Sequence, residues 1–329
     1  MLQSIWKRRF LSCAIASVFA IGQASFATEL TVVGYNVESG GAQAAVVAER
    51  IAAIDGCDLW GFSEVQNESW ARTFEEAAAV GEGDNADFDY LLGSTGGADK
   101  LAIVYDRNRF ELIEQFEVNE INVGGRVRAP LVARLRDGHS GQEFFFMVNH
   151  LYRSKASQRR LQATLLNRWA QSQALPIIAV GDYNFDWSVP NGDADHDEGF
   201  DELVGGDVFA WIRPPEPLVR SQCSTQYNSV LDFVFVAGAA QAWNGVSEIV
   251  VAEGDCPDDN TTSDHRPVRA TFDIPLPSTT QPSNSTRPSS SSQPTTSSAD
   301  VRQALLDRIQ RLEAELAELR RLVEQLPDG

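Results

Sequence analysis

Seven short runs of β-branched and aromatic residues constrain the fold of this chain more than any other feature of its sequence. Each run has the length of one strand, and polar loops or helical stretches separate the runs. Several connections are too short to contain a crossover helix, which argues against a doubly wound parallel sheet and predicts an α/β fold with mixed sheets. The expected strands are 30–37, 59–65, 101–106, 143–151, 176–185, 231–238 and 268–274, and the expected helices are 44–54, 69–80 and 157–173.

Polar residues interrupt or follow most of these runs at positions where a buried strand does not need them. A charged group in an apolar strand is costly unless it is paired or bound to a metal ion. Several such groups at strand ends therefore predict a functional site that is built on a rigid sheet. They are Asn36 in "GYNV", Glu64 in "FSEVQ", His150 in "VNHLYR", Asp182 and Asn184 in "VGDYNFD", Asp232 in "SVLDFVFV", and Asp264 and His265 in "SDHRPV".

The order and local context of these motifs resemble the endonuclease/exonuclease/phosphatase superfamily, and its pancreatic-type deoxyribonuclease-like members in particular. The combination of "GDYN" with a terminal "SDHRPV" is the most specific part of the resemblance, which covers roughly residues 29–274. The superfamily also includes neutral sphingomyelinases and inositol-phosphate phosphatases. The resemblance implies its fold here: a four-layer α/β sandwich with two packed mixed β-sheets.

The resemblance also implies a metal site. Glu64 is similar to the main metal-binding carboxylate of the superfamily, with Asn36 beside it and Asp264 as a second carboxylate on the metal side. Hard oxygen ligands of this kind suit Mg²⁺ or Mn²⁺.

Catalytic roles follow in the same way. Asp182 resembles the residue that orients or deprotonates the attacking water, and Asn184 the amide that holds a phosphate oxygen. His265 resembles the histidine that polarises the scissile phosphate, with Asp232 as its orienting carboxylate.

Three further residues resemble parts of the nuclease branch. His150 is similar to the second histidine of that branch, and Asp99 occupies the place of its acidic partner, where glutamate is usual. Arg128 in "RVRAP" resembles a phosphate-contacting arginine.

These residue types fit phosphodiester hydrolysis without reference to any family. Water must attack in line while negative charge builds on the phosphate oxygens, and a metal ion, a protonated histidine and an amide can stabilise that charge. A carboxylate can prepare the water. We therefore expect a metal-dependent phosphodiesterase, with a nuclease acting on DNA or RNA as the leading interpretation. A sphingomyelinase-like lipid phosphodiesterase, a phosphomonoesterase and a catalytically inactive binding domain remain as alternatives.

The N-terminal residues and the charge bear on compartment and substrate. Basic residues at 7–9, a short apolar run and small residues at Ser25 and Ala27 describe a secretory signal peptide at residues 1–27. We expect an exported protein, secreted or periplasmic, with no membrane span.

The chain has 27 basic and 46 acidic residues, and loss of the three basic residues at 7–9 would change its net charge from −19 to −22. That acidity opposes tight binding of nucleic acid unless metal ions or salt screen it.

Three cysteines remain after the expected cleavage, an odd number in an oxidising compartment. Cys57 precedes an apolar strand and is expected to be buried, whereas Cys223 and Cys256 lie in polar, loop-like sequence. We predict a Cys223–Cys256 disulfide.

The catalytic domain is expected at 28–275, followed by a Ser/Thr/Pro-rich linker at 276–300 and a helix at 301–327. Leucines recur every seven residues from Leu305 to Leu326, and apolar residues fall four positions after the first three of them. This pattern predicts a coiled coil that joins two or three chains in a homo-oligomer. The alternative is a lone amphipathic helix packed on the main domain.

The acidic stretch "DADHDEGFDE" resembles a calcium loop because Asp193, Asp195 and Asp197 alternate. Glu198 stands where such a loop requires glycine, so a solvated acidic loop is the favoured interpretation and structural Ca²⁺ the alternative.

Overall fold

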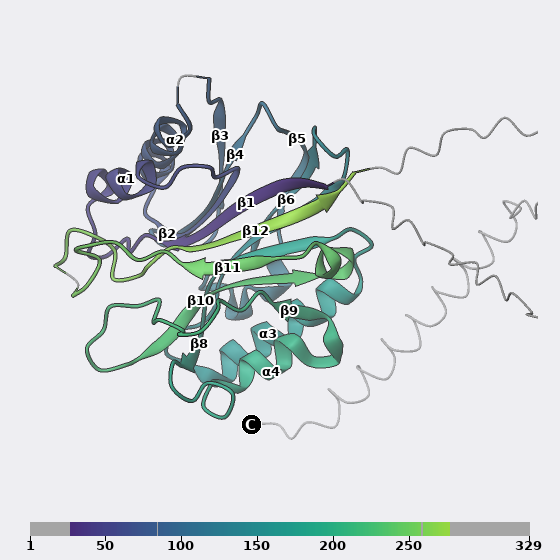
Figure 1. Cartoon of the computed structure of the whole chain (residues 1–329). Helices are drawn as coiled ribbons and strands as arrows, with labels where there is room; N and C mark the ends of the chain where they lie inside the picture. Colours follow the sequence, from purple (N-terminus) through teal and green to yellow (C-terminus); the bar gives the residue numbers. More distant parts are fainter. Residues whose placement is uncertain (1–26, 84, 258, 277–329) are drawn as a thin grey trace, which may run out of the picture. The chain divides into compact units, whose positions relative to one another are not determined.

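The computed structural model describes residues 27–83, 85–257 and 259–276, and these residues form an α/β sandwich of two packed six-stranded sheets (Figure 1). Each sheet is mixed, because β1 pairs in parallel with β2, and β7 with β8, while the other pairs are antiparallel. The mixed α/β fold predicted from the sequence is confirmed.

The first sheet has the order β11-β12-β1-β2-β4-β3, and the second has the order β5-β6-β7-β8-β10-β9. The strands of the first sheet are β1 (Ala27–Asn36), β2 (Leu59–Val65), β3 (Phe88–Leu92), β4 (Lys100–Asp106), β11 (Val246–Ile249) and β12 (Val268–Pro275). Those of the second are β5 (Phe110–Glu117), β6 (Leu131–Asp137), β7 (Glu143–His150), β8 (Ile177–Ser188), β9 (Phe209–Trp211) and β10 (Ser229–Ala237).

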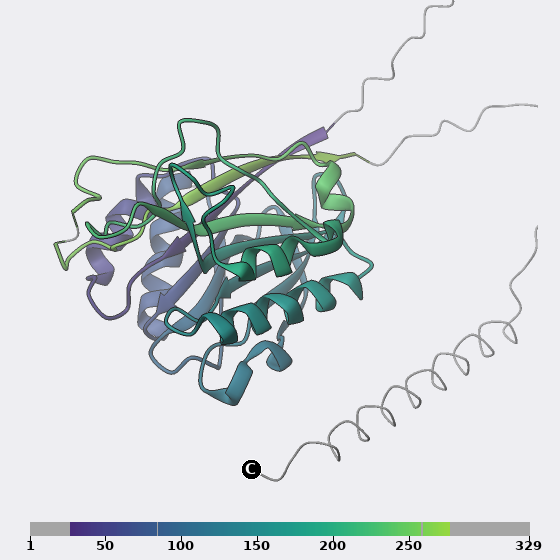
Figure 2. The same cartoon turned by 90° about the horizontal axis from the view of Figure 1, so that it is seen from below.

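Helices cover the outer faces of both sheets. Figures 1 and 2 show α1 (Ala44–Ala52) and α2 (Glu68–Glu82) over the first sheet, with α3 (Ala156–Gln171) and α4 (Glu198–Val204) over the second. Their apolar faces are buried there. Short 3₁₀ turns are η1 (Asn119–Ile121), η2 (Val123–Gly125), η3 (Gly205–Asp207) and η4 (Gly238–Ala242).

The two sheets approach each other closely along their central strands, since β1 packs against β8 and β2 against β7. Gly61 of β2 makes this approach possible. A Cβ atom there would lie 2.7 Å from a methyl group of Val148 and would also collide with Val180. The side chains of the two inner faces interdigitate around this contact to form the main core.

The strand directions bring the predicted polar residues to one edge of the sandwich. The carboxyl ends of the parallel pairs β1–β2 and β7–β8 lie at this edge, and the amino ends of the antiparallel strands β10 and β12 lie beside them. Asn36 and His150 are the last residues of their strands, and His265 lies three residues before β12. The sheet therefore positions residues that are far apart in the sequence.

Several elements differ from the sequence-based expectation. The strands β3, β5, β6, β9 and β11 and the helix α4 are additional. Strand β5 lies at a sheet edge and carries exposed glutamates, so it lacks an apolar run. In β6, the outward-facing Arg134 and Arg136 both pair with Glu143 of β7, so that charges form part of a regular ladder.

The predicted signal peptide at 1–27, the linker and the coiled coil lie outside the described residues, except for the residues at their inner boundaries. Within the described part of the chain, none of the helices combines the length and the apolarity that crossing a membrane requires.

Candidate active site

A cleft of about 500 Å³ opens at the edge where the strand ends converge. Five carboxylates line it, together with the amide of Asn184 and the imidazole of His265. Arg153 and Arg159 also line the cleft, but the carboxylates outnumber the cationic side chains, so the net charge disfavours a phosphate group unless a further cation is bound. The five carboxylates are those of Glu38, Glu64, Asp182, Asp186 and Asp264.

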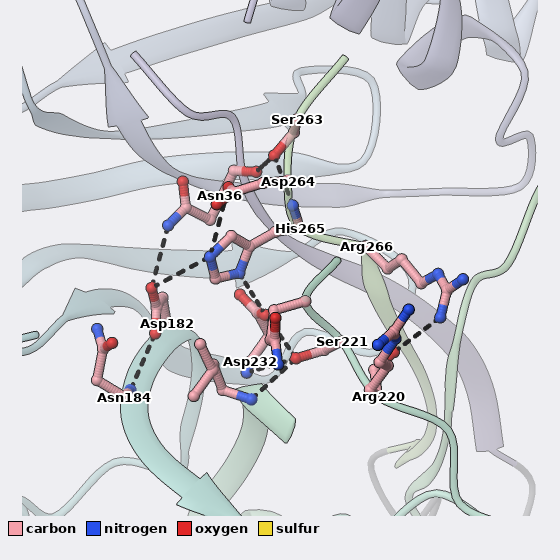
Figure 3. A network of polar contacts seen from close by, with 12 residues as sticks. Asn36, Asp182, Asn184, Arg220, Ser221, Asp232, Ser263, Asp264, His265 and Arg266 are labelled. Atoms are coloured by element: carbon pink, nitrogen blue, oxygen red, sulfur yellow. Dashed lines mark hydrogen bonds and ion pairs between the residues drawn. The ribbon is translucent and has the colours of Figure 1, made fainter. Parts of the chain in front are cut away.

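His265 is held by a buried carboxylate (Figure 3). Its Nδ1 donates to Oδ2 of Asp232 over 2.7 Å, and its Nε2 lies 3.8 Å from Oδ2 of Asp182. Burial alone would lower the pKa of His265. The charge of Asp232 and its hydrogen bond outweigh this effect, so the pKa lies well above the ordinary value and the ring is held as an imidazolium.

Ser221 fixes the orientation of Asp232 and was not identified from the sequence. Its hydroxyl donates to the same Oδ2 over 2.7 Å and accepts from the backbone N–H groups of Leu231 and Asp232. The segment around Ser221 also pairs with the segment around His265, because the N–H of Arg266 donates to the Ser221 carbonyl over 2.6 Å. No feature of "RSQC" distinguishes this serine in the sequence.

The segment "SDHRPV" is anchored at its first two residues. The Ser263 hydroxyl donates to the carbonyl oxygen of Asn36 over 2.6 Å, and the Asp264 N–H donates to the carboxylate of Glu38 over 2.8 Å. Figure 3 shows Ser263, Asp264 and His265 in this arrangement. The loop before β12 is thereby fixed to the end of β1, in the opposite half of the domain sequence.

Asn36 bridges two carboxylates. Its Nδ2 donates to Glu64 Oε1 over 3.1 Å and to Asp182 Oδ2 over 3.0 Å, while its Oδ1 accepts from the N–H of Glu38. One amide therefore connects the two sheets at the floor of the cleft.

Asp182 is 2% exposed and lies in β8, directly after Gly181. Burial raises its pKa, while the nearby histidines oppose that shift. Its Oδ1 accepts from the N–H of Asn184 over 2.9 Å. Gly181 has φ of 135°, and a side chain there would collide with the carbonyl oxygen of Asn149, so the close approach of β7 to β8 requires glycine.

His150 lies between three predicted site residues. Its Nε2 is 3.4 Å from Asp182 Oδ2 and 3.8 Å from Glu64 Oε1, and its Nδ1 is 3.4 Å from Asp99 Oδ1. Burial, followed by the positive charge of Arg128, lowers the pKa of His150 to about 3, so this ring is neutral. The two histidines of the site thus differ in charge.

Asp99 and Arg128 form an ion pair of 2.8 Å between Oδ2 and Nη1. Burial raises the pKa of Asp99 to about 6, although Arg128 acts in the opposite direction. Arg128 was expected to contact a phosphate. The structure places it beside Asp99 and largely buried, and it does not line the cleft.

The backbone is strained at the cleft. Seven described residues other than glycine have positive φ, and four of them line the cleft: Glu38, Glu64, Asn184 and Asp186. Backbone strain of this kind costs of order 1–3 kcal/mol per residue and concentrates at functional sites. In β2 the strain coincides with an irregular register between Phe62 and Val65, which turns Glu64 out of the ladder.

The arrangement fits a divalent cation at Glu64. The hydrogen bond that Glu64 accepts from Asn36 uses Oε1, the carboxylate of Asp264 accepts no hydrogen bond from any described residue, and both side chains line the cleft. Glu64 also belongs to one of two clusters whose ligand atoms lie within 4.8 Å of one another, with Asp99 and His150. The other cluster, Asp182, Asp232 and His265, is already joined by the 2.7 Å hydrogen bond between its last two members.

The acidic loop at residues 193–197 resembles a calcium loop in its sequence, but its carboxylates are not arranged as calcium ligands in the structure. The carboxylate of Asp193 pairs with Arg213 over 2.8 Å, and that of Asp197 pairs with Arg159 over 2.5 Å and caps α4. These arginines occupy the oxygens that a cation would need. The solvated acidic loop is the interpretation that the geometry favours.

The predicted Cys223–Cys256 disulfide is present, and Cys57 is buried and free. The bridge joins the segment before β10 to the segment before β12, which carry Ser221 and His265 respectively. It therefore links the two loops that hold the Asp232–His265 pair.

Comparisons with known proteins agree with this geometry. A model of the Endonuclease/Exonuclease/phosphatase family matches residues 33–265. No curated protein matches the chain significantly. A solved structure of an endonuclease/exonuclease/phosphatase family protein from Bacteroides thetaiotaomicron is 19% identical, with a TM-score of 0.57 over 76% of this chain and 96% of that chain.

Two other solved structures have the same fold. D. rerio TDP2 complexed with single-strand DNA product is 16% identical, with a TM-score of 0.58 over 74% of this chain and 99% of that chain. A mannosyl-6-phosphatase from Bacteroides thetaiotaomicron is 18% identical, with a TM-score of 0.52 over 74% and 99%. Because the family match spans most of the chain, and the motifs that carry it meet in one cleft, the chain belongs to the endonuclease/exonuclease/phosphatase family, whose members hydrolyse phosphoester bonds.

Proposed function

We propose that the chain is an exported, divalent-metal-dependent phosphodiesterase that acts as a nuclease on DNA or RNA. The observation that carries this proposal is the meeting of a charged Asp232–His265 pair with the buried Asp182 at the floor of an acidic cleft. This set supplies a base, a cationic hydrogen-bond donor and open carboxylate oxygens within one site.

In this mechanism water attacks phosphorus from the side of Asp182. The Asp182 carboxylate, whose pKa is raised by burial, accepts the proton as the new O–P bond forms. The imidazolium of His265 donates a hydrogen bond from Nε2 to a non-bridging phosphate oxygen as charge accumulates. The bond between phosphorus and the leaving oxygen then breaks, and the leaving oxygen takes a proton from solvent. The amide of Asn184 lines the same cleft and can donate to a second phosphate oxygen.

Glu64 and Asp264 would hold the metal ion, with Asn36 orienting Glu64 through its amide. A bound Mg²⁺ or Mn²⁺ would offset the negative charge of the cleft and stabilise the charge that develops on the phosphate. His150, which is neutral, can accept or donate a hydrogen bond without adding charge to the site.

The substrate class has two kinds of support. His150 with its acidic neighbour Asp99 is the arrangement that the resemblance assigns to nucleases, and one structural neighbour was solved with a DNA product. A lipid substrate would need exposed aromatic residues for insertion into a membrane. The aromatic segment "VFAWI" around β9 contains Trp211, but its ring packs against Trp187 of β8 and Phe233 of β10.

The experiment is a substrate panel with Mg²⁺, Mn²⁺ or Ca²⁺ on DNA, RNA, sphingomyelin vesicles and a phosphomonoester. We expect cleavage of nucleic acid, and loss of that activity in His265→Ala and Asp182→Asn. His139→Ala is the matched control, because His139 lies exposed in the β6–β7 turn away from the cleft. Preferential hydrolysis of the vesicles or of the monoester would replace the nuclease assignment, and no hydrolysis at all would support a binding domain.

A further inference from the structure

The two arginines that line the cleft differ in their partners among the described residues. Arg153 and Arg159 both line the cleft, but Arg159 is ion-paired with Asp197 and donates to the carbonyl groups of Tyr152 and Arg153. The Arg153 guanidinium is exposed and has no hydrogen bond or ion pair with any described residue. In a chain with 46 acidic residues, an arginine without a carboxylate partner is available to an anionic ligand.

Two further cations lie near Arg153 and also lack carboxylate partners among the described residues. Lys155 stands over the ring of Tyr152, with Nζ 5.9 Å from its centroid. The hydroxyl of Tyr152 donates to the carbonyl oxygen of Val123 over 3.4 Å, and the exposed Arg126 follows three residues later in that loop. Lys155 and Arg126 are therefore exposed cations in segments joined to Arg153 through Tyr152.

A second cleft residue is an exposed aromatic ring. Tyr227 is 58% exposed and lines the cleft, and its ring does not stack on any described aromatic side chain. Its carbonyl oxygen accepts from Nε2 of Gln222 over 3.1 Å, and Gln222 forms a backbone bridge with His265. The ring is thus exposed while its backbone is fixed to the catalytic segment.

The strand order places these two residues around the catalytic strand. Arg153 follows β7 and Tyr227 precedes β10, and β7 and β10 are the two neighbours of β8 in the sheet. Since β8 carries Asp182 at this edge, the cation and the aromatic ring come from the strands that flank the residue proposed to activate water. A polynucleotide offers a group for each of these side chains: a phosphate at each link, which suits the arginine, and an aromatic base, which suits the tyrosine ring.

We propose that Arg153 and Tyr227 form a nucleotide subsite of the cleft, an inference that rests on the proposed phosphodiesterase function. Arg153, supported by Lys155 and Arg126, binds the phosphate next to the scissile one, and Tyr227 stacks on an unpaired base. The substrate class is then a single-stranded or locally unpaired polynucleotide, because a base within a duplex does not offer its face to a side chain.

The test compares three substrates of the full-length enzyme: a single-stranded oligonucleotide, the same oligonucleotide with abasic residues flanking the scissile phosphate, and bis(p-nitrophenyl) phosphate, which has no neighbouring phosphate. Arg153→Ala should lower kcat/KM for both oligonucleotides, relative to the small diester, by roughly tenfold or more. It should also reduce the slope of log kcat/KM against log salt by about one. Arg153→Lys should keep most of the activity on oligonucleotides and the full slope.

Tyr227→Ala should lower kcat/KM for the oligonucleotide that carries bases by roughly tenfold, as expected for the loss of one stacking contact. The abasic oligonucleotide should show little of this loss, and Tyr227→Phe should restore activity on the oligonucleotide with bases. Arg72→Ala is the matched control for charge, because Arg72 lies exposed on α2 and outside the cleft.

The inference is overturned if Arg153→Ala and Tyr227→Ala affect the small diester as strongly as the oligonucleotides, or affect none of them. It is also overturned if duplex DNA or sphingomyelin vesicles are cleaved faster than the single strand. Wild-type enzyme that hydrolyses no phosphodiester would instead refute the proposed function on which the subsite rests.

Discussion

Replacing Asp232 by asparagine removes the charge that holds His265 while preserving the shape of the side chain. Asp232 is 2% exposed, and its Oδ2 accepts from both His265 and Ser221 over 2.7 Å. An asparagine oxygen can accept the same two hydrogen bonds, so the variant is expected to fold. What it lacks is the negative charge that keeps the imidazole protonated.

The loss of stability follows from the change in the hydrogen bond. A buried hydrogen bond with an ionised partner contributes roughly 1.5–3 kcal/mol to the free energy of unfolding. About half of that contribution remains when both partners of the bond are neutral. The new amide group would also occupy the place of Asp232 Oδ1, which has no hydrogen-bond partner among the described residues. We expect the free energy of unfolding to fall by about 2–3 kcal/mol at pH 6.

The pH dependence has a definite sign. The pKa of His265 in the folded state is raised above its unfolded value near 6.5, so the pair contributes its stability fully below pH 6.5 and loses it as pH rises through the folded pKa. The difference between wild type and Asp232→Asn should therefore be largest at pH 6 and smaller at alkaline pH. Turnover should fall by roughly 10²–10⁴, and the alkaline limb of the pH–rate profile should move to lower pH.

Urea denaturation at pH 6 and pH 9 and kcat measured across this range test these numbers. Asp137→Asn is the matched control, because Asp137 is equally buried and pairs with Arg109 and Ser140 at the opposite end of the same sheet. The control should lose stability without a shift in its pH–rate profile. If Asp232→Asn retained both wild-type turnover and the wild-type alkaline limb, the assigned role of the Asp232–His265 pair would be refuted.

Three other changes test separate parts of the structure. Asp99→Asn should raise the free energy of unfolding by about 1 kcal/mol at pH 7.5, a value reduced for the partial solvent exposure of Asp99. The reason is that the pKa of Asp99 is raised in the folded state, so its ionised carboxylate disfavours folding above pH 6. Denaturation at pH 4 should show no such gain, and equal gains at both pH values would contradict this cause. Gly181→Ala should lower stability by about 3 kcal/mol or more by urea denaturation, whereas Gly205→Ala, whose added Cβ would lie in open space, should change it by less than about 1 kcal/mol. A chain that ends at Leu276 should be a monomer by light scattering while the full chain is a dimer or trimer, and an oligomeric truncated form would exclude the heptads as the cause.

The catalytic residues could be located from the sequence because they stand out locally. A carboxylate such as Asp232 inside an apolar strand, or a polar group such as Asn36 at a strand end, has no role in packing that explains it. Strand direction then brings these positions to one edge, so the register of the sheet does not need to be known in advance. Their roles came from the family resemblance rather than from these patterns.

The supporting residues could not be located in this way. Ser221, Arg153 and Tyr227 lie in loops, where serine, arginine and tyrosine are ordinary, and their positions depend on long-range contacts such as the bridge between Gln222 and His265. Arg128 is the opposite case, because the sequence singled it out but its position in the structure differs from the expected one. Its motif indicates a phosphate contact, but the pairing with Asp99 is visible only in three dimensions.

The edge strands were missed for a related reason. Strand β5 owes its place in the sheet to β6, and its own sequence contains too many exposed glutamates for an apolar pattern. The propensity of a strand depends on its neighbours in the sheet, which a single sequence does not reveal.

The central claim is that the acidic cleft hydrolyses phosphodiesters with a divalent ion held at Glu64, and metal-dependent hydrolysis of bis(p-nitrophenyl) phosphate tests it most directly. Wild-type enzyme treated with EDTA should be inactive, and titration with Mg²⁺ or Mn²⁺ should restore the rate to a plateau. Glu64→Gln should need at least about tenfold more metal for half of its own maximal rate, because it removes a carboxylate ligand. Full activity of the wild-type enzyme in EDTA, or an unchanged metal requirement in Glu64→Gln, would contradict the account.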